Sequence, residues 1–270
     1  MMMTMIPTLT YYNIAEGVTA FSTTRHGGMS QGVYGEFNIN PYCGDASSAI
    51  ATNRRLLADE LGISEDLIFL PHQIHSTRNF DLTDNFLMCP KELRFMQLEG
   101  IDSITTACRG VCIGVSTADC IPVLLYDREH RCCAAVHAGW RGTVQRIVEK
   151  TLRTMTELYE TRPAAVTAVI GPGISLKNFE VGSDVFFKFS DAGFDRRRVA
   201  RKMPAKDHPN SRKWHIDLPA CNTIQLVDSG VLPKFIKQSN ICTYDDVEDY
   251  FSARRLGPDS GRIYTGIILR

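Results

Sequence analysis

The sequence predicts a mixed α/β (α+β) fold, built as one layered sheet domain with flanking helices over residues 1–270, of which 1–19 form a short lead-in. Three observations lead to this prediction. Apolar runs of strand length alternate with stretches of helical spacing, and no repeat, low-complexity tract or linker divides the chain. The composition, 44% hydrophobic and 22% charged residues, is also that of an ordinary globular domain.

The first half predicts a loop, a helix and several strands. A glycine-rich stretch over 25–35 is read as a loop, because clustered glycines let the backbone pass close to other groups. A helix follows, with Asp45 as the cap of its first turn and Gly62 as its end. Short apolar runs then predict buried strands at 67–70, 111–115, 121–126 and 132–136.

The second half returns to helices. From Val144 to Leu158 the apolar residues recur at helical spacing, and a strand over 164–170 follows, closed by the turn at 171–173. Two more helices are expected, at 180–190 and from 217 to the stop at 229–230. The segment 196–213, with an arginine run and later Pro and Asn residues, is expected to be an exposed excursion.

Charge and cysteine content narrow the function classes. Thirty basic residues balance thirty acidic ones, so the chain has no overall charge to attract nucleic acid or an anionic membrane. No export signal and no apolar run of bilayer length are visible, which predicts a cytoplasmic protein. Nine irregularly spaced cysteines in so large a chain fit reduced thiols in that compartment better than disulfides.

Three strand-end segments carry side chains suited to a metal. They are Pro71 to Ser76, with His72 and His75; the turn with Cys120; and the stretch after His137. Two imidazoles and a thiolate suit zinc, and a catalytic zinc site commonly uses three protein ligands. His75, Cys120 and His137 fit this pattern. Spacing alone leaves open whether His72 or His75 binds, and we favour a supporting or structural role for His72.

Five blocks of the chain resemble the YfiH family. They are STTRHGG (22–28) with FN (37–38), QIH (73–75), TADCIPV (117–123), HAGWRG (137–142), and CTY (242–244) with FSARR (251–255). That family is described both as a laccase-like polyphenol oxidase and as a purine nucleoside phosphorylase. The resemblance implies phosphorolysis of adenosine, inosine and methylthioadenosine, with deamination of adenosine in the same pocket. It also implies a fold similar to that of deamidating cysteine hydrolase toxins.

The resemblance places the metal ligands on His75, Cys120 and His137, which decides against His72. Zinc is the expected metal, with copper as the alternative, and purine nucleosides and phosphate are the expected partners. One departure from the family pattern lies beside a ligand: the residue after the histidine of the QIH block is often Gly and here is Ser76.

Four further residues are expected at the substrate. Arg141 and Arg25 are candidates for phosphate, since a guanidinium offers forked donors and Arg141 lies near the start of a helix. Asn38 is a candidate for nucleoside contacts. Asp119 either orients a metal histidine or moves a proton, or it serves only in packing or in capping a turn.

Three rival functions use the same residues differently. A metal-free cysteine hydrolase or deamidase would employ Cys120 as nucleophile with His137 or His75 as base. A polyphenol oxidase would require copper, and seven histidines without an H-x-H pair offer few ligands for a multicopper cluster. A non-enzymatic module would bind nucleosides without turnover. We favour the phosphorylase and deaminase hypothesis.

Overall fold

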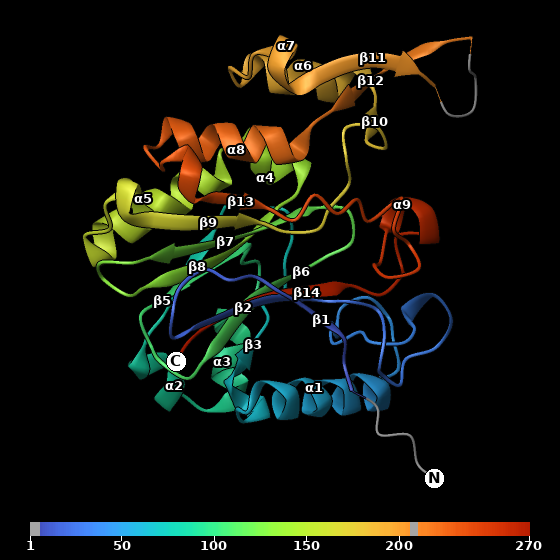
Figure 1. Cartoon of the computed structure of the whole chain (residues 1–270). Coiled ribbons are helices and arrows are strands. Elements are labelled where there is room, and N and C mark those ends of the chain that lie inside the picture. Colours follow the sequence, from blue (N-terminus) through green and yellow to red (C-terminus); the bar gives the residue numbers. More distant parts are fainter. Residues whose placement is uncertain (1–5, 206–209) are drawn as a thin grey trace.

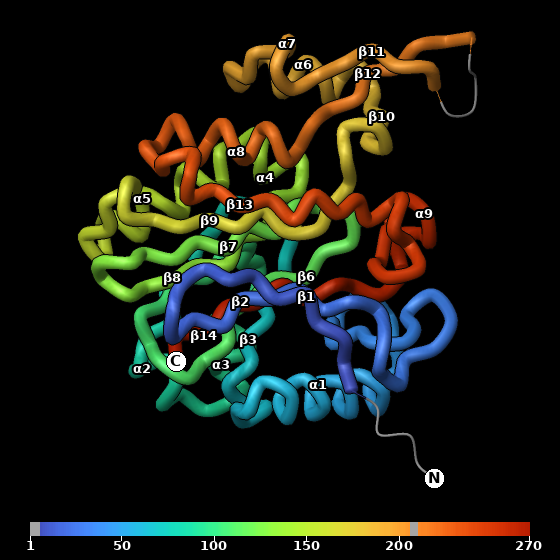
Figure 2. Tube along the Cα trace, in the orientation of Figure 1, coloured from blue at the N-terminus to red at the C-terminus, as the bar shows by residue number. Residues whose placement is uncertain are grey.

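The main body of the protein is a stack of four layers, in which helices cover the outer faces of two sheets that pack against each other, and a small third sheet lies beyond the helix layer that holds α8 (Leu218–Asp228) (Figure 1, Figure 2). The computed structural model describes residues 6–205 and 210–270. The mixed α/β prediction is confirmed, but the strands form three sheets rather than one. None of the helices in the described ranges is long and apolar enough to cross a membrane.

The first sheet brings the two ends of the chain together. Its strands, in spatial order, are β1 (Leu9–Tyr11), β2 (Val18–Thr23), β14 (Ile263–Leu269), β6 (Cys112–Thr117) and β3 (Ile68–Phe69). β14 pairs antiparallel with both β2 and β6. Helix α1 (Ser47–Leu61) covers the outer face, where Leu57 and Leu61 join a buried cluster with Phe21 and Tyr264.

The second sheet has six strands. In spatial order they are β13 (Ile236–Gln238), β9 (Val166–Ile170), β7 (Ile121–Asp127), β8 (Cys133–Ala138), β5 (Ser103–Thr106) and β4 (Asn79–Leu82). Every residue of β7 and β8 is buried, which explains why both were recognisable as apolar runs. The outer face is covered by α4 (Trp140–Val144), α5 (Ile147–Tyr159) and α8 (Leu218–Asp228).

The main core lies between these two sheets. Ile113 and Ile267 of the first sheet belong to the same buried cluster as Leu124 and Ala135 of the second. Shorter helices close the edges of the stack: α2 (Asp84–Met88), α3 (Lys91–Gln97) and α9 (Ala253–Leu256). Single 3-10 turns lie at Gly32–Tyr34, Glu65–Leu67, Pro163–Ala165 and Pro233–Phe235.

The predicted excursion over 196–213 is instead part of a small third sheet. Its strands are β10 (Glu180–Val181), β12 (Arg212–Ile216) and β11 (Ala200–Pro204), and it carries α6 (Ser183–Asp191) and α7 (Arg196–Val199). Phe186 of α6 stacks on Trp214 of β12 with ring centroids 3.7 Å apart. Most described residues of this segment are exposed, as expected, but the segment forms a helix and two strands that the sequence did not predict. Residues 206–209 lie outside the described residues.

Two local predictions also need correction. The expected helix from Val144 to Leu158 is two helices, α4 and α5, because Arg146 between them has a left-handed backbone (φ 62°). Asp45 does not cap α1: the N-cap is Ala46, without a side-chain bond. The Asp45 carboxylate instead accepts hydrogen bonds from Ser30 Oγ at 2.6 Å and Asn38 Nδ2 at 2.8 Å, so it holds the preceding loop.

The facing pair Gly114 and Gly266 generates a stability prediction. These residues are opposite each other on β6 and β14, and a Cβ at Gly114 would lie 2.3 Å from Cζ of the buried Tyr264 ring. Gly114→Ala therefore overpacks the core, and we expect the free energy of unfolding to fall by about 3 kcal/mol. Denaturant unfolding measures this, with Ser48→Ala on the exposed side of α1 as control. Equal stability of the two variants would contradict the packing argument.

Candidate metal centre and substrate cavity

His75, Cys120 and His137 meet at one point of the structure. Their ligand atoms all lie within 4.8 Å of one another, and His75 Nε2 is 3.8 Å from Cys120 Sγ. The three come from the segment after β3, the turn between β6 and β7, and the end of β8. Gly139 makes the approach possible, since a Cβ there would lie 2.8 Å from His75 Cδ2 and 3.0 Å from Cys120 Sγ.

Two residues of this region have left-handed backbones although neither is glycine. His75 has φ 62° and Asp119 has φ 84°, conformations that cost about 1 kcal/mol or more and persist only where surrounding contacts hold them. Asp119 is held by Thr243 Oγ1, which donates to its carboxylate at 2.8 Å, and by the backbone N–H of Arg254 at 2.6 Å. Asp119 thus joins the turn with Cys120 to the C-terminal segment.

His75 is held by Asp102, a fully buried carboxylate. It accepts hydrogen bonds from the backbone N–H groups of His75 (3.0 Å) and Ser76 (2.7 Å), and from Ser76 Oγ (2.7 Å). It also accepts from His137 Nδ1 at 2.7 Å, which leaves Nε2 of that ring for a metal or a proton. Ser76, which stands where the family often has glycine, therefore adds a hydrogen bond to Asp102, the carboxylate that orients His75 and His137.

The charges in the triad depend on one another. Burial raises the pKa of the Cys120 thiol, but the nearby His137 and His75 rings outweigh this and lower it to about 6. Burial likewise lowers the pKa of His137, but Cys120 and Asp102 raise it to about 9. For Asp102, burial is opposed by the hydrogen bonds from His137 and Ser76, and its pKa is lowered. Without a metal, the site at pH 7 holds a thiolate beside an imidazolium.

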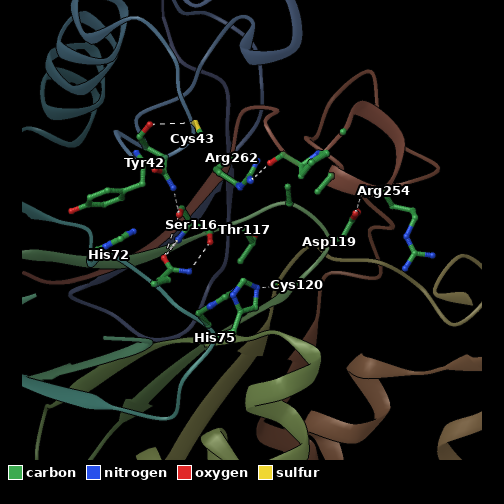
Figure 3. A pocket seen from close by; sticks show the side chains of 17 residues that line it. Tyr42, Cys43, His72, His75, Ser116, Thr117, Asp119, Cys120, Arg254 and Arg262 are labelled. Carbon is green, nitrogen blue, oxygen red and sulfur yellow. Dashed lines mark hydrogen bonds between the residues drawn. The ribbon is translucent and has the colours of Figure 1, made fainter. Parts of the chain in front are cut away.

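The triad lies in the wall of a cavity of about 680 Å³. Figure 3 shows the side chains that line it, with His75 and Cys120 close together on one side and Tyr42 and His72 at one end. The lining residues come from the segments 40–43, 72–75, 116–120 and 253–262, together with His137. A volume of this size suits a small-molecule ligand such as a nucleoside.

Three of the four predicted substrate residues lie outside this lining. Arg25 donates from Nε to Gly35 O and from a terminal nitrogen to Val247 O, so its guanidinium fastens two loops. Asn38 is fully buried, and its amide group contacts Asp45 and the backbone of Asn40. Arg141 is exposed and stacks on Trp140. Asp119 does line the cavity, and its contacts are those of the turn-fixing alternative.

Sequence reasoning missed Asp102, the carboxylate that orients His137, and the cavity arginines Arg254 and Arg262. A lone acidic residue immediately before the run Ser103–Thr106 was the available signal for Asp102, because burial of a charge requires partners. Arg254 belongs to the FSARR block that carries the family resemblance. No local pattern distinguishes Arg262 from the chain's other arginines.

Comparison with known proteins agrees with the fold and with the blocks described above. A family model described as multi-copper polyphenol oxidoreductase laccase matches residues 19–270. A protein of Bacteroides thetaiotaomicron named purine nucleoside phosphorylase is 41% identical, over 93% of this chain and 92% of its own length. A protein from an unknown prokaryotic organism, named adenosine deaminase RL5, is 38% identical over 96% of this chain and 97% of its own.

Solved structures give the same result for the fold. The crystal structure of a hypothetical protein YfiH from Bacillus licheniformis superposes with a TM-score of 0.85 at 25% identity, covering 96% of this chain and 99% of that one. YlmD from Geobacillus stearothermophilus superposes with a TM-score of 0.81 at 26% identity, covering 94% and 93% of the two chains. The expected similarity to the YfiH fold is therefore confirmed.

Asp102 supports a prediction about metal affinity. Asp102→Asn removes the charge that faces His137 and weakens the hold on the His75 segment, so we expect zinc affinity to fall about 10- to 100-fold. Competition with a chromogenic chelator measures this, with Asp228→Asn, an exposed position at the end of α8, as control. Unchanged affinity would show that the carboxylate has no part in metal binding.

The lowered pKa of Cys120 predicts selective alkylation of the metal-free protein. A thiol with a pKa of about 6 is mostly thiolate at pH 7, whereas burial raises the pKa of Cys43, which lines the same cavity. Iodoacetamide should therefore modify Cys120 at least about tenfold faster than Cys43. The Cys120 rate should fall as the pH drops below 6, because the thiol is then protonated. Peptide mass spectrometry follows both sites, and equal rates would be incompatible with a stabilised thiolate.

Proposed function

The chain belongs to the enzyme family described as multi-copper polyphenol oxidoreductase laccase, and we propose that it is a zinc-dependent purine nucleoside phosphorylase that also deaminates adenosine. The observation that carries this proposal is the group His75, Cys120 and His137 in the wall of a cavity of nucleoside size. Relatives that match nearly the whole chain and are named for these two activities support it.

The donor set fits zinc. Two imidazoles and a thiolate are ligands of catalytic zinc, and the hydrogen bond from His137 Nδ1 to Asp102 is the kind of outer contact that zinc histidines make. A bound zinc ion supplies a Lewis acid and an activated water, which suits attack on C6 of adenosine. The chain's own part is to hold the three ligands, to keep Nε2 of His137 toward the cavity, and to bind the nucleoside.

Phosphorolysis also needs a group that binds phosphate. In the reaction a phosphate oxygen attacks C1′ of the sugar, the C1′–N9 bond breaks, and the electron pair of that bond remains on the purine. We assign phosphate to Arg254, which lines the cavity. Its guanidinium donates one N–H to Glu180 O at 3.1 Å and lies 5.5 Å from the centre of the Phe179 ring. In Figure 3 it points away from His75 and Cys120, so the side chain has to turn toward the cavity to hold phosphate. A guanidinium has five N–H donors, so others remain for the phosphate oxygens. Arg25 and Arg141 are not part of this assignment, because neither lines the cavity.

The ligand groups argue against multicopper oxidation. His₂Cys is also a ligand set of single copper sites, so one copper ion would fit the triad. A multicopper centre needs further clusters of ligands. Within 6–205 and 210–270, however, His75, Cys120 and His137 form the single group of three or more candidate ligands.

The cysteine hydrolase alternative rests on a specific observation. A thiolate beside an imidazolium, as in Cys120 and His137, is the arrangement of a cysteine nucleophile with its base. This alternative predicts activity that resists chelators and is abolished by alkylation. The phosphorylase proposal predicts instead that removal of the metal abolishes turnover.

Product analysis tests the proposal. Purified protein with known metal content is incubated with inosine, adenosine or methylthioadenosine, with and without phosphate and chelator, and the products are separated. We expect free base and sugar 1-phosphate only when phosphate is present, and loss of activity with the chelator. Cys120→Ser should lower turnover at least about 100-fold, whereas Cys89→Ser, outside the cavity lining, should not. Absence of free base in all reactions with phosphate would refute the phosphorylase.

A further inference from the structure

His72 belongs to the same cavity as the metal triad and is paired with a carboxylate. His72 Nδ1 lies 2.6 Å from Glu99 Oε1, and the imidazole stacks on the Tyr42 ring with centroids 4.2 Å apart and planes 25° from parallel. Both His72 and Tyr42 line the cavity, at one end of it (Figure 3). Neither the metal nor the phosphate assignment uses this pair.

The backbone around His72 is held on both sides. Its N–H donates to Leu98 O at 3.0 Å, and its carbonyl accepts from Gly100 N at 2.9 Å. The next side chain, Gln73, bonds the backbone of Ser116 in both directions, at 2.8 Å and 2.7 Å. The His72 side chain is nevertheless 36% exposed, so the ring is fixed in place and still reaches solvent protons.

The pairing determines which nitrogen is available. A carboxylate on Nδ1 holds the proton of that nitrogen, and Nε2 is then the atom that gives or takes a proton. This is the arrangement that general acids and bases of the histidine type share. A surface ion pair alone would have little effect on stability, since Glu99 is 56% exposed.

Departure of the purine is helped by a proton donor, and in the proposed function the three side chains of the triad are occupied as metal ligands. When the C1′–N9 bond breaks, negative charge develops on the purine, and N7 is a hydrogen-bond acceptor on the same five-membered ring. We propose that His72 is the general acid of phosphorolysis: its Nε2 proton passes to N7 as the C1′–N9 electron pair enters the purine. Glu99 is a positioning residue that holds Nδ1, and solvent returns the proton to His72 afterwards. This inference rests on the proposed phosphorylase function.

A substrate that needs no proton provides the test. In 7-methylinosine the five-membered ring of the purine already carries a positive charge. The purine therefore leaves as a neutral base without receiving a proton from a general acid. We expect His72→Phe, which keeps an aromatic ring on Tyr42, to lower kcat/KM for inosine about 100-fold and to change it less than about threefold for 7-methylinosine. Glu99→Gln should show the same selectivity with a smaller loss, about tenfold for inosine.

The chain offers a matched control in His130. Its Nδ1 lies 2.9 Å from Asp127 Oδ2 and its side chain is 35% exposed, but it is not part of the cavity lining. His130→Phe should leave both substrates unaffected. Thermal unfolding shows whether each variant is folded, and His72→Asn replaces His72→Phe if the larger ring prevents folding.

The outcomes separate the two claims. Equal losses on the two substrates, or no loss on inosine, overturn the role of His72 while the phosphorylase function stands. If the unaltered protein splits neither substrate with phosphate present, the proposed function fails and the role of His72 fails with it. A loss confined to inosine supports both.

Discussion

The buried carboxylate of Asp102 is the group on which the rest of the site depends. It lies immediately before β5, and its side chain accepts hydrogen bonds from the segment after β3 and from His137 at the end of β8. Its backbone carbonyl also accepts from His137 N at 2.8 Å. A buried charge is tolerated only where its acceptor positions are filled. Here the partners of the carboxylate are His137 and the backbone at His75. The hydrogen bonds that allow the charge of Asp102 to be buried therefore also position two of the three candidate ligands.

A second carboxylate, Asp119, closes the cavity from the other side. The turn that carries Cys120 is fixed by the bond from Ile174 N to Asp119 O at 2.8 Å, and by the bonds of the Asp119 carboxylate to Thr243 and to the backbone of Arg254. The same bonds bring the start of α9 against the turn, which places Arg254 at the cavity. The C-terminal strand β14 continues from this segment and pairs with β6, the strand that leads into the turn. The cavity therefore requires residues from both halves of the chain, which fits a single continuous family match over 19–270.

The sequence predicted what is local and missed what is distant. β6 to β9 were recognised from their buried apolar runs, whereas β2 and β14 were not, although β14 is also buried throughout; these two strands are defined by pairing between the chain ends. The ligand types of His75, Cys120 and His137 were readable from chemistry and family blocks. The partners of Asp102 lie 26 to 35 residues away along the chain, and no sequence pattern predicts that they pair with it. Arg25 was expected at the substrate because it stands in a glycine-rich loop, and Asn38 as a contact to the nucleoside, yet the donors of both side chains are used in holding loops together.

Asp102 also determines how protons compete with a metal at the triad. Together with the Cys120 thiolate, which has the larger effect, it raises the pKa of His137 to about 9, so that His137 carries an extra proton at pH 7 when no metal is bound. Cys120 has the opposite balance, since its pKa of about 6 leaves it deprotonated at that pH. A metal must therefore displace one proton from the pair at neutral pH, and two once the pH falls below 6. The His137 imidazolium stabilises the Cys120 thiolate, but it must itself lose a proton before His137 can bind a metal. The hydrogen bond by which Asp102 orients His137 therefore also strengthens the competition between that proton and the metal.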